Sequence, residues 1–169
     1  MKKIIVTTTI NPPTRATLEY CKRKDWQFII VGDTKTPHDE YRKLEQKFSN
    51  VLYLDPETQE KKYKKLSDAI GWKSIQRRNI GFVEAYHLGA DILATVDDDN
   101  IPYDNWGRNL VVGKKIAVDY YETRDIVFDP LSITSDNYIW HRGFPIQLLS
   151  SRLNSEYKGK TERTKFKIY

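Results

Sequence analysis

The sequence has few of the features that mark secreted, membrane-spanning or P-loop proteins. Cys21 is the only cysteine among 169 residues, which excludes an intramolecular disulfide framework and is typical of a reducing compartment. No apolar run approaches the roughly 20 residues that a membrane-spanning helix needs. The sequence contains no Walker A loop and no GxGxxG, so neither type of Gly-rich phosphate cradle is available. We therefore expect a cytoplasmic protein without a membrane span.

The composition is that of a globular protein with an excess of positive charge. Hydrophobic residues make up 39% and charged residues 30%, and the length suits a single domain that buries a real core. The net charge of +5 and a pI near 9.1 indicate anionic partners without choosing among them. Basic residues concentrate at 21–24, 61–65, 73–78 and 158–167. We interpret the first, second and last of these runs as solvated surface.

The basic run at 73–78 differs because it lies near the start of a predicted helix. Positive charges there oppose the helix dipole, so helix stability does not explain Lys73, Arg77 and Arg78. These side chains are either solvated or in contact with an anionic ligand.

Strand-like and helix-like patterns alternate along residues 3–96. Apolar, β-branched runs predict strands at 3–9, 26–33, 50–56 and 91–96. Helical patterns cover 14–24, 38–48, 57–71 and 73–91. Thr14 is placed as an N-cap, and Gly71 and Gly89 lie where helices end. This alternation predicts an α/β fold with a mainly parallel sheet and helices packed on it.

Polar side chains follow each predicted strand, at the edge where α/β sheets bind ligands. The most unusual exit is "TVDDDN", in which Asp97, Asp98 and Asp99 follow a hydrophobic strand. Alternate residues of an extended segment point to the same side, so Asp97 and Asp99 can converge on Mg²⁺ or Mn²⁺ and, through it, on substrate phosphates. The alternative is an acidic turn without a metal.

Several motifs in order resemble those of nucleotide-diphospho-sugar transferases with the GT-A fold. They are a Thr-rich first strand, Asp33 after the second strand, "RRNIGFVEAYHLGADILATVDDD", "FDPLS" and "HRGFP". The set is most similar to the reversibly glycosylated polypeptide/UDP-arabinopyranose mutase group and the related STELLO-like plant proteins. The resemblance covers roughly residues 3–149 and implies a three-layer GT-A-like α/β sandwich.

The resemblance also implies roles for single residues. Thr8 and Thr9 would line the nucleoside pocket, Asp33 would contact the base or ribose, and Arg78 would approach the base or the phosphates. Asp97 and Asp98 would lie near the ribose and the sugar. Asp97 and Asp99 would bind the metal, with Asp99 as the principal ligand.

The candidate catalytic residues are Asp98, Arg142 and His141, of which Arg142 matches a mutase-type "RGYP" segment. An inverting transferase needs a base on the acceptor hydroxyl. His141 and Asp136 are candidates for that base, and Asp119 and Asp129 remain alternatives.

We therefore predict a metal-dependent glycosyltransferase, of hexosyl- or pentosyltransferase type, that uses Mn²⁺ or Mg²⁺ and a UDP-sugar donor. Residues 1–150 would form the nucleotide-sugar-binding domain, and residues 151–169 a basic tail that is flexible or docks on a partner. A homo-oligomer or a partner subunit would suit the short stretch after "HRGFP".

Two other classes of function remain as alternatives. A UDP-sugar mutase or self-glycosylating protein would use the same donor without an external acceptor. The other class is a non-catalytic module that binds a nucleotide-sugar or nucleic acid, and nucleic-acid binding would explain the basic runs. Nucleic acid, however, gives the three aspartates no role.

Overall fold

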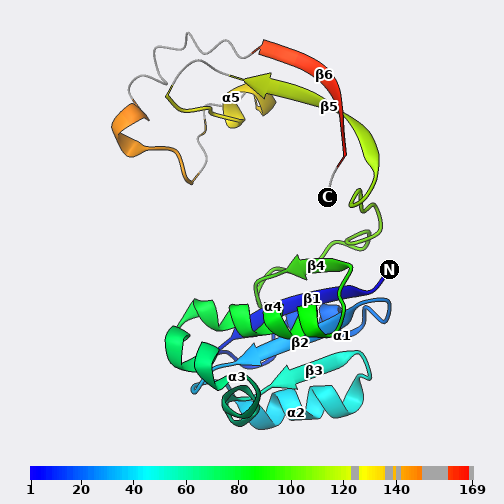
Figure 1. Ribbon diagram of the computed structural model, residues 1–169, viewed down its shortest axis with the longest axis vertical. Coiled ribbons are helices and arrows are strands. Elements are labelled where there is room, and N and C mark those ends of the chain that lie inside the picture. The colour runs from blue at the N-terminus through cyan, green and yellow to red at the C-terminus, as the bar shows by residue number, and fades with distance from the viewer. Residues whose placement is uncertain (123–125, 136–138, 140–141, 150–159, 168–169) are drawn as a thin grey trace. The chain divides into compact units, whose positions relative to one another are not determined.

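The computed structural model describes residues 1–122, 126–135, 139, 142–149 and 160–167 (Figure 1). The chain divides into two compact units, Met1–Asn109 and Leu110–Tyr169. The boundary expected after residue 150 stays a prediction.

The first unit is built on a parallel four-stranded sheet (Figure 1). Its strands are β1 (Lys3–Thr9), β2 (Gln27–Gly32), β3 (Val51–Leu54) and β4 (Ile92–Thr95). They lie in the order β3-β2-β1-β4, and all three neighbouring pairs are parallel. The predicted α/β class with a mainly parallel sheet is confirmed, and the carboxyl ends of these strands meet at one edge.

Four α-helices connect the strands of this unit. They are α1 (Arg15–Cys21), α2 (His38–Lys47), α3 (Pro56–Ile70) and α4 (Arg78–His87). Thr14 caps α1 by accepting a hydrogen bond from the Thr17 N–H at 3.1 Å, as predicted. Gly71 and Gly89, with φ of 71° and 75°, follow α3 and α4 in the left-handed region that glycine adopts without a Cβ clash. No helix in the described part of the chain is both long and apolar enough for a membrane span.

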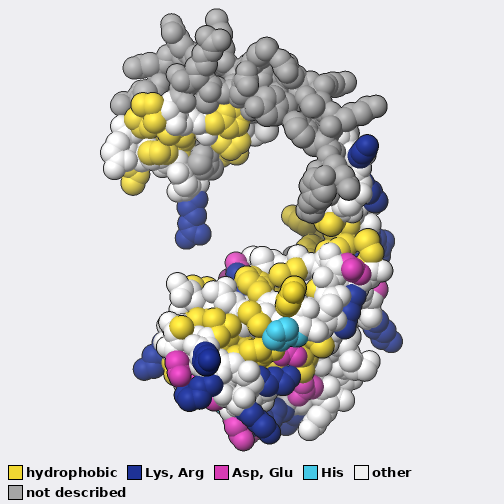
Figure 2. Space-filling model, in the orientation of Figure 1, with side chains coloured by type: hydrophobic (Ala, Val, Ile, Leu, Met, Phe, Trp, Pro, Cys, Tyr) yellow, Lys and Arg dark blue, Asp and Glu magenta, His cyan; other side chains and the backbone are white. Residues whose placement is uncertain are grey.

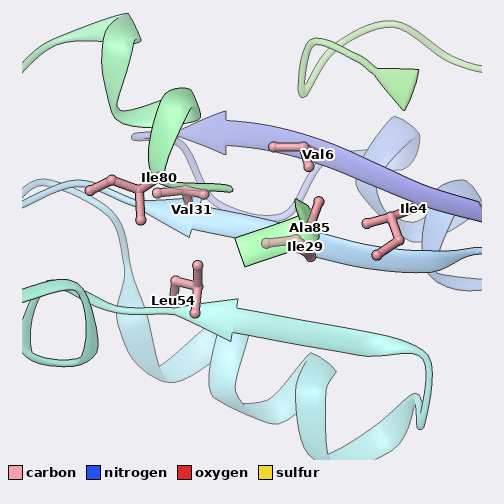
Figure 3. Packing of buried hydrophobic residues seen from close by; sticks show 7 residues of the cluster. All are labelled: Ile4, Val6, Ile29, Val31, Leu54, Ile80 and Ala85. Atoms are coloured by element: carbon pink, nitrogen blue, oxygen red, sulfur yellow. The ribbon is translucent and has the colours of Figure 1, made fainter. Parts of the chain in front are cut away.

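Helix α4 and the strands enclose the apolar core of the unit (Figure 3). The buried cluster consists of Ile4, Val6, Ile29, Val31, Leu54, Ile80 and Ala85. Partly buried side chains of α3, such as Leu66 and Ile70, pack against it. This packing fixes α4 against β1 and β2.

Strand residues that alternate with those of the core cluster contact α1 and α2. The ring of Tyr20 in α1 lies 5.7 Å from that of Phe28 in β2. Tyr41 in α2 stacks on Tyr53 in β3, with ring centroids 5.3 Å apart. Because Phe28 alternates with the core residue Ile29, these rings pack on the other side of the strands.

The helix predicted over residues 73–91 begins later than expected. Residues Ile75–Arg77 form a short 3₁₀ turn, η1, and α4 starts only at Arg78. Ile75, which the periodicity placed on the apolar face, is 67% exposed. Lys73 is the physical reason, because its φ of 60° is incompatible with a continuous helix.

The lysines of the basic run at 61–65 are exposed on α3. This agrees with their interpretation as solvated surface. Lys64 pairs with Asp68 at 3.0 Å, and Lys62 with Glu84 at 3.3 Å. Figure 2 shows Lys and Arg side chains over α2 and α3 interspersed with Asp and Glu. Local ion pairs thus offset part of the positive charge on this surface.

The second unit contains a two-stranded antiparallel sheet of β5 (Lys115–Glu122) and β6 (Lys160–Lys167). Helix α5 (Leu131–Thr134) and the 3₁₀ turn η2 (Ile146–Leu148) are its other elements among the described residues. Part of the basic tail is therefore paired as a strand.

Candidate functional site

The exits of three strands line one pocket at the carboxyl edge of the parallel sheet. Thr8 and Thr9 end β1, Asp33 follows β2, and Asp98 follows β4. All four side chains line a cavity of about 450 Å³. Sequence analysis had placed each of them at a nucleotide-binding site, and the structure brings them together.

Asp98 is tied to the end of β1. Its carboxylate accepts hydrogen bonds from the Thr9 hydroxyl at 2.5 Å and from the Asn11 amide at 3.0 Å. The Thr14 hydroxyl donates to the Asp98 carbonyl oxygen. These contacts fix the middle aspartate of the DDD motif at the wall of the pocket.

Asp97 faces a different partner. Arg78, at the start of α4, donates to an Asp97 carboxylate oxygen at 2.6 Å. The Arg78 side chain is 19% exposed, and its Nε has no hydrogen-bond partner among the described residues. Arg78 and Asp97 are therefore neighbours, although neither of them lines the pocket with Thr8 and Asp33.

Asp99 is exposed, and its carboxylate has no ion pair or hydrogen bond within the described residues. The same part of the chain contains no group of three or more His, Cys, Asp and Glu side chains that could hold a metal. Mg²⁺ sites commonly use one or two carboxylates and complete their coordination with water and substrate phosphates. Asp98 and Asp99 lie in a turn, in which the Asn100 N–H donates to the Asp97 carbonyl oxygen at 3.4 Å, so the extended segment expected to align Asp97 with Asp99 does not form. The donor types of the two carboxylates fit a Mg²⁺ site, and the metal pair stays a prediction.

Asp33 holds a loop that also lines the pocket. Its side chain is 2% exposed and accepts from the backbone N–H of Ser74 at 3.3 Å and of Thr34 at 2.6 Å. Burial alone would raise the pKa of Asp33. Hydrogen bonds from the backbone of Lys73, Thr34 and Ser74 and from the Thr34 hydroxyl outweigh it and lower the pKa below its ordinary value. Asp33 is thus ionised and already hydrogen-bonded to protein groups.

The residues of that loop, Gly71 to Ile75, form what we call the pocket turn. Lys73, Ser74 and Ile75 line the cavity. Lys73 is the one non-glycine residue with positive φ in the described chain, at 60°. A left-handed conformation costs a residue with a Cβ on the order of 1 kcal/mol. Such strain concentrates at functional sites.

Arg77 is neither solvated nor open to a ligand, so both interpretations of the basic run at 73–78 are wrong for this residue. Its side chain is fully buried and donates through Nε to the Gln59 Oε1 at 3.0 Å and through Nη1 to the Ser67 Oγ at 2.9 Å. The guanidinium lies over the Trp72 ring at 3.6 Å. Arg77 is therefore a buried link between α3 and Trp72 of the pocket turn.

The predicted catalytic residues of the C-terminal part lie in the second unit. Arg142 is exposed, whereas His141 falls outside the described residues. Among the alternative bases, Asp129 is fully buried and accepts from the Leu131 N–H at 3.1 Å. Asp136 and the side chain of Asp119 are not described. Their roles stay predictions.

Sequence analysis missed several residues that line the pocket. They are Ile10 and Asn11 after β1, Lys35 after β2, and Ser74 and Ile75 of the pocket turn. The strand-exit rule could have found Asn11 and Lys35, since each lies within three residues of a strand end. Ser74 and Ile75 had no such signal.

No protein-family model matches the chain. It is 22% identical over 166 residues to Probable glycosyltransferase STELLO2 of Arabidopsis thaliana, and the match covers 92% of this chain. Probable glycosyltransferase STELLO1 of the same plant matches with the same identity and coverage. The chain is a distant relative of proteins named glycosyltransferases. It spans about a fifth of their length, since the match covers 21% of each.

Proposed function

We propose that the chain is the donor-binding part of a metal-dependent glycosyltransferase and binds a UDP-sugar at the carboxyl edge of its parallel sheet. The observation that carries this proposal is the single pocket lined by Thr8, Thr9, Asp33 and Asp98. The distant similarity to STELLO1 and STELLO2, which are named probable glycosyltransferases, supports a transferase function. A cavity of about 450 Å³ has a size typical of small-molecule sites.

The fold proposed to go with this function is a three-layer GT-A-like sandwich. Support comes from α3 and α4, which pack on the core cluster that contains Ile29. Further support comes from α1 and α2, whose rings contact Phe28 and Tyr53 from the other side of the strands.

Asp97 and Asp99 are the proposed ligands of Mn²⁺ or Mg²⁺. When bound, the ion would neutralise the donor diphosphate and act as a Lewis acid on the leaving nucleotide. The chain's own contribution is positional. Asp98 is fixed by Thr9 at 2.5 Å, and Arg78 orients Asp97 at 2.6 Å. The Asp99 carboxylate has no protein partner among the described residues and is available to the metal ion.

Asp98, Arg142 and His141 are the proposed catalytic residues. Arg142 is exposed, so its guanidinium is accessible to a ligand. This part of the proposal rests on the resemblance of the "HRGFP" segment to the mutase-type "RGYP" segment.

Calorimetric titration of UDP into the native chain, with and without Mn²⁺, tests this function. We expect binding that Mn²⁺ strengthens at least tenfold, and loss of that gain in Asp99→Ala because the metal loses its principal ligand. Asp104→Ala is the matched control, since it removes another exposed carboxylate shortly after the same strand.

Equal affinity for UDP with and without Mn²⁺ would contradict the metal assignment. The absence of UDP binding under both conditions would overturn the donor-binding function itself.

A further inference from the structure

The pocket turn, Gly71 to Ile75, places a lysine where the backbone would favour another residue. Lys73 has a φ of 60°, a conformation that glycine and asparagine adopt more readily. Gly71, two residues earlier, has a φ of 71° and meets the same demand without a side chain. Backbone conformation therefore does not explain a lysine at position 73.

The turn is held from two sides, so the position of Lys73 is determined by the fold. Arg77, buried beneath it, donates to the Gly71 carbonyl oxygen at 3.4 Å. Asp33 accepts a hydrogen bond from the backbone N–H of Ser74, the residue after Lys73, at 3.3 Å. These contacts place the Lys73 side chain at the wall of the pocket that Thr8 lines.

Two cations at this pocket lack partners in the described chain. Lys35 and Lys73 both line the cavity, and neither ammonium group has an ion pair or a hydrogen bond among the described residues. The two carboxylates of the pocket already accept protein hydrogen bonds, Asp33 from backbone N–H groups and Asp98 from Thr9 and Asn11. The ammonium groups thus remain available to an anion from solution.

Phosphate is the anion that this arrangement suits. The sequence has no Gly-rich loop of the kind whose backbone N–H groups cradle phosphate in other nucleotide sites. Within the pocket turn, the Ser74 N–H is already donated to Asp33. A lysine ammonium binds phosphate as a point charge.

We propose that Lys73 is a phosphate-binding residue, presented to the nucleotide by the left-handed pocket turn, and that Lys35 assists it. This inference rests on the nucleotide-binding function proposed above. The chemical class of the ligand is a nucleoside diphosphate.

The decisive variant is Lys73→Gly, because glycine tolerates the positive φ and removes only the side chain. Uridine, UMP and UDP are titrated into the native chain and the variant in the presence of Mn²⁺. We expect UDP to bind about tenfold or more weakly to Lys73→Gly, while the affinity for uridine is unchanged. Lys73→Arg should retain most of the UDP affinity, since it keeps the charge.

Two controls separate charge from folding. Lys61→Ala removes an exposed cation of α3 and should leave all three affinities unchanged. Thermal unfolding of Lys73→Gly should show a stability equal to or above that of the native chain, since the backbone strain is relieved.

Equal UDP affinity in Lys73→Gly and the native chain would overturn the role of Lys73 and leave the donor-binding function standing. An equal loss of uridine and UDP affinity would also overturn it, because the side chain would then shape the pocket rather than bind phosphate. A native chain that binds none of the three ligands would overturn both proposals.

Discussion

The Thr9 hydroxyl donates a 2.5 Å hydrogen bond to the Asp98 carboxylate, across 89 residues of sequence. It joins the end of β1 to the acidic segment after β4. Thr9 also accepts from the Asn11 N–H at 3.0 Å. The hydroxyl of this threonine thus organises two polar groups at the pocket wall.

Thr9→Val should destabilise the chain by about 1–2 kcal/mol, because it removes a partly buried hydrogen bond to a charged group and leaves the Asn11 N–H without its acceptor. Thr7→Val is the matched control, since the buried Thr7 hydroxyl has no hydrogen-bond partner among the described residues. That control should be neutral or stabilising. Urea unfolding measures both, and equal free-energy losses for the two variants would contradict the assigned role of Thr9.

Arg77→Met should destabilise the chain by roughly 3 kcal/mol, because Gln59 and Ser67 lose the buried donors that satisfy them. Lys64→Ala, which breaks only exposed ion pairs on α3, should leave the free energy of unfolding nearly unchanged. Chemical denaturation distinguishes the two. A near-neutral Arg77→Met would mean that the guanidinium does not hold α3 to the pocket turn.

Gly81→Ala should destabilise the chain by about 1–3 kcal/mol, although alanine is the better helix former. A Cβ at Gly81 would lie 2.4 Å from Val6 Cγ1 and 2.9 Å from Val31 Cγ2, so α4 would have to move off the sheet. Combining Gly81→Ala with Val6→Ala should cost less than the sum of the two single changes. Strict additivity, measured by denaturation of all three variants, would argue against this contact.

Asp33 should contribute to the pH dependence of stability. Its pKa is lowered in the folded chain, so its stabilising effect is complete above the unfolded value near 3.8 and is lost as the pH falls through the folded value. Asp33→Asn should therefore be less stable than the native chain at pH 6, and the gap should narrow between about pH 5 and pH 2. Unfolding free energies at several pH values test this expectation. A constant gap would contradict it, and exposed Asp68→Asn is the control.

The sheet could be predicted from sequence because its information is local. Every residue from Ile4 to Thr9 is β-branched, and the structure forms β1 over Lys3–Thr9. The strand-exit rule then placed Thr8, Thr9, Asp33 and Asp98 at one edge, since parallel strands end together.

Features that depend on distant partners could not be predicted. Arg77 is buried because Gln59 and Ser67 of α3 satisfy it, and nothing in its own neighbourhood indicates that pairing. The left-handed Lys73 likewise lies in a turn that Asp33, 40 residues earlier in the sequence, holds through the Ser74 N–H. Its backbone conformation interrupts a helical pattern that the local periodicity favours.

A crystal structure of the chain with UDP and Mn²⁺, with anomalous data that locate the metal, tests the account most directly. We predict a Mn²⁺ peak at Asp97 and Asp99, with the uridine in the pocket lined by Thr8 and Asp33. UDP bound elsewhere on the chain, or a metal peak away from residues 97–99, would contradict the account.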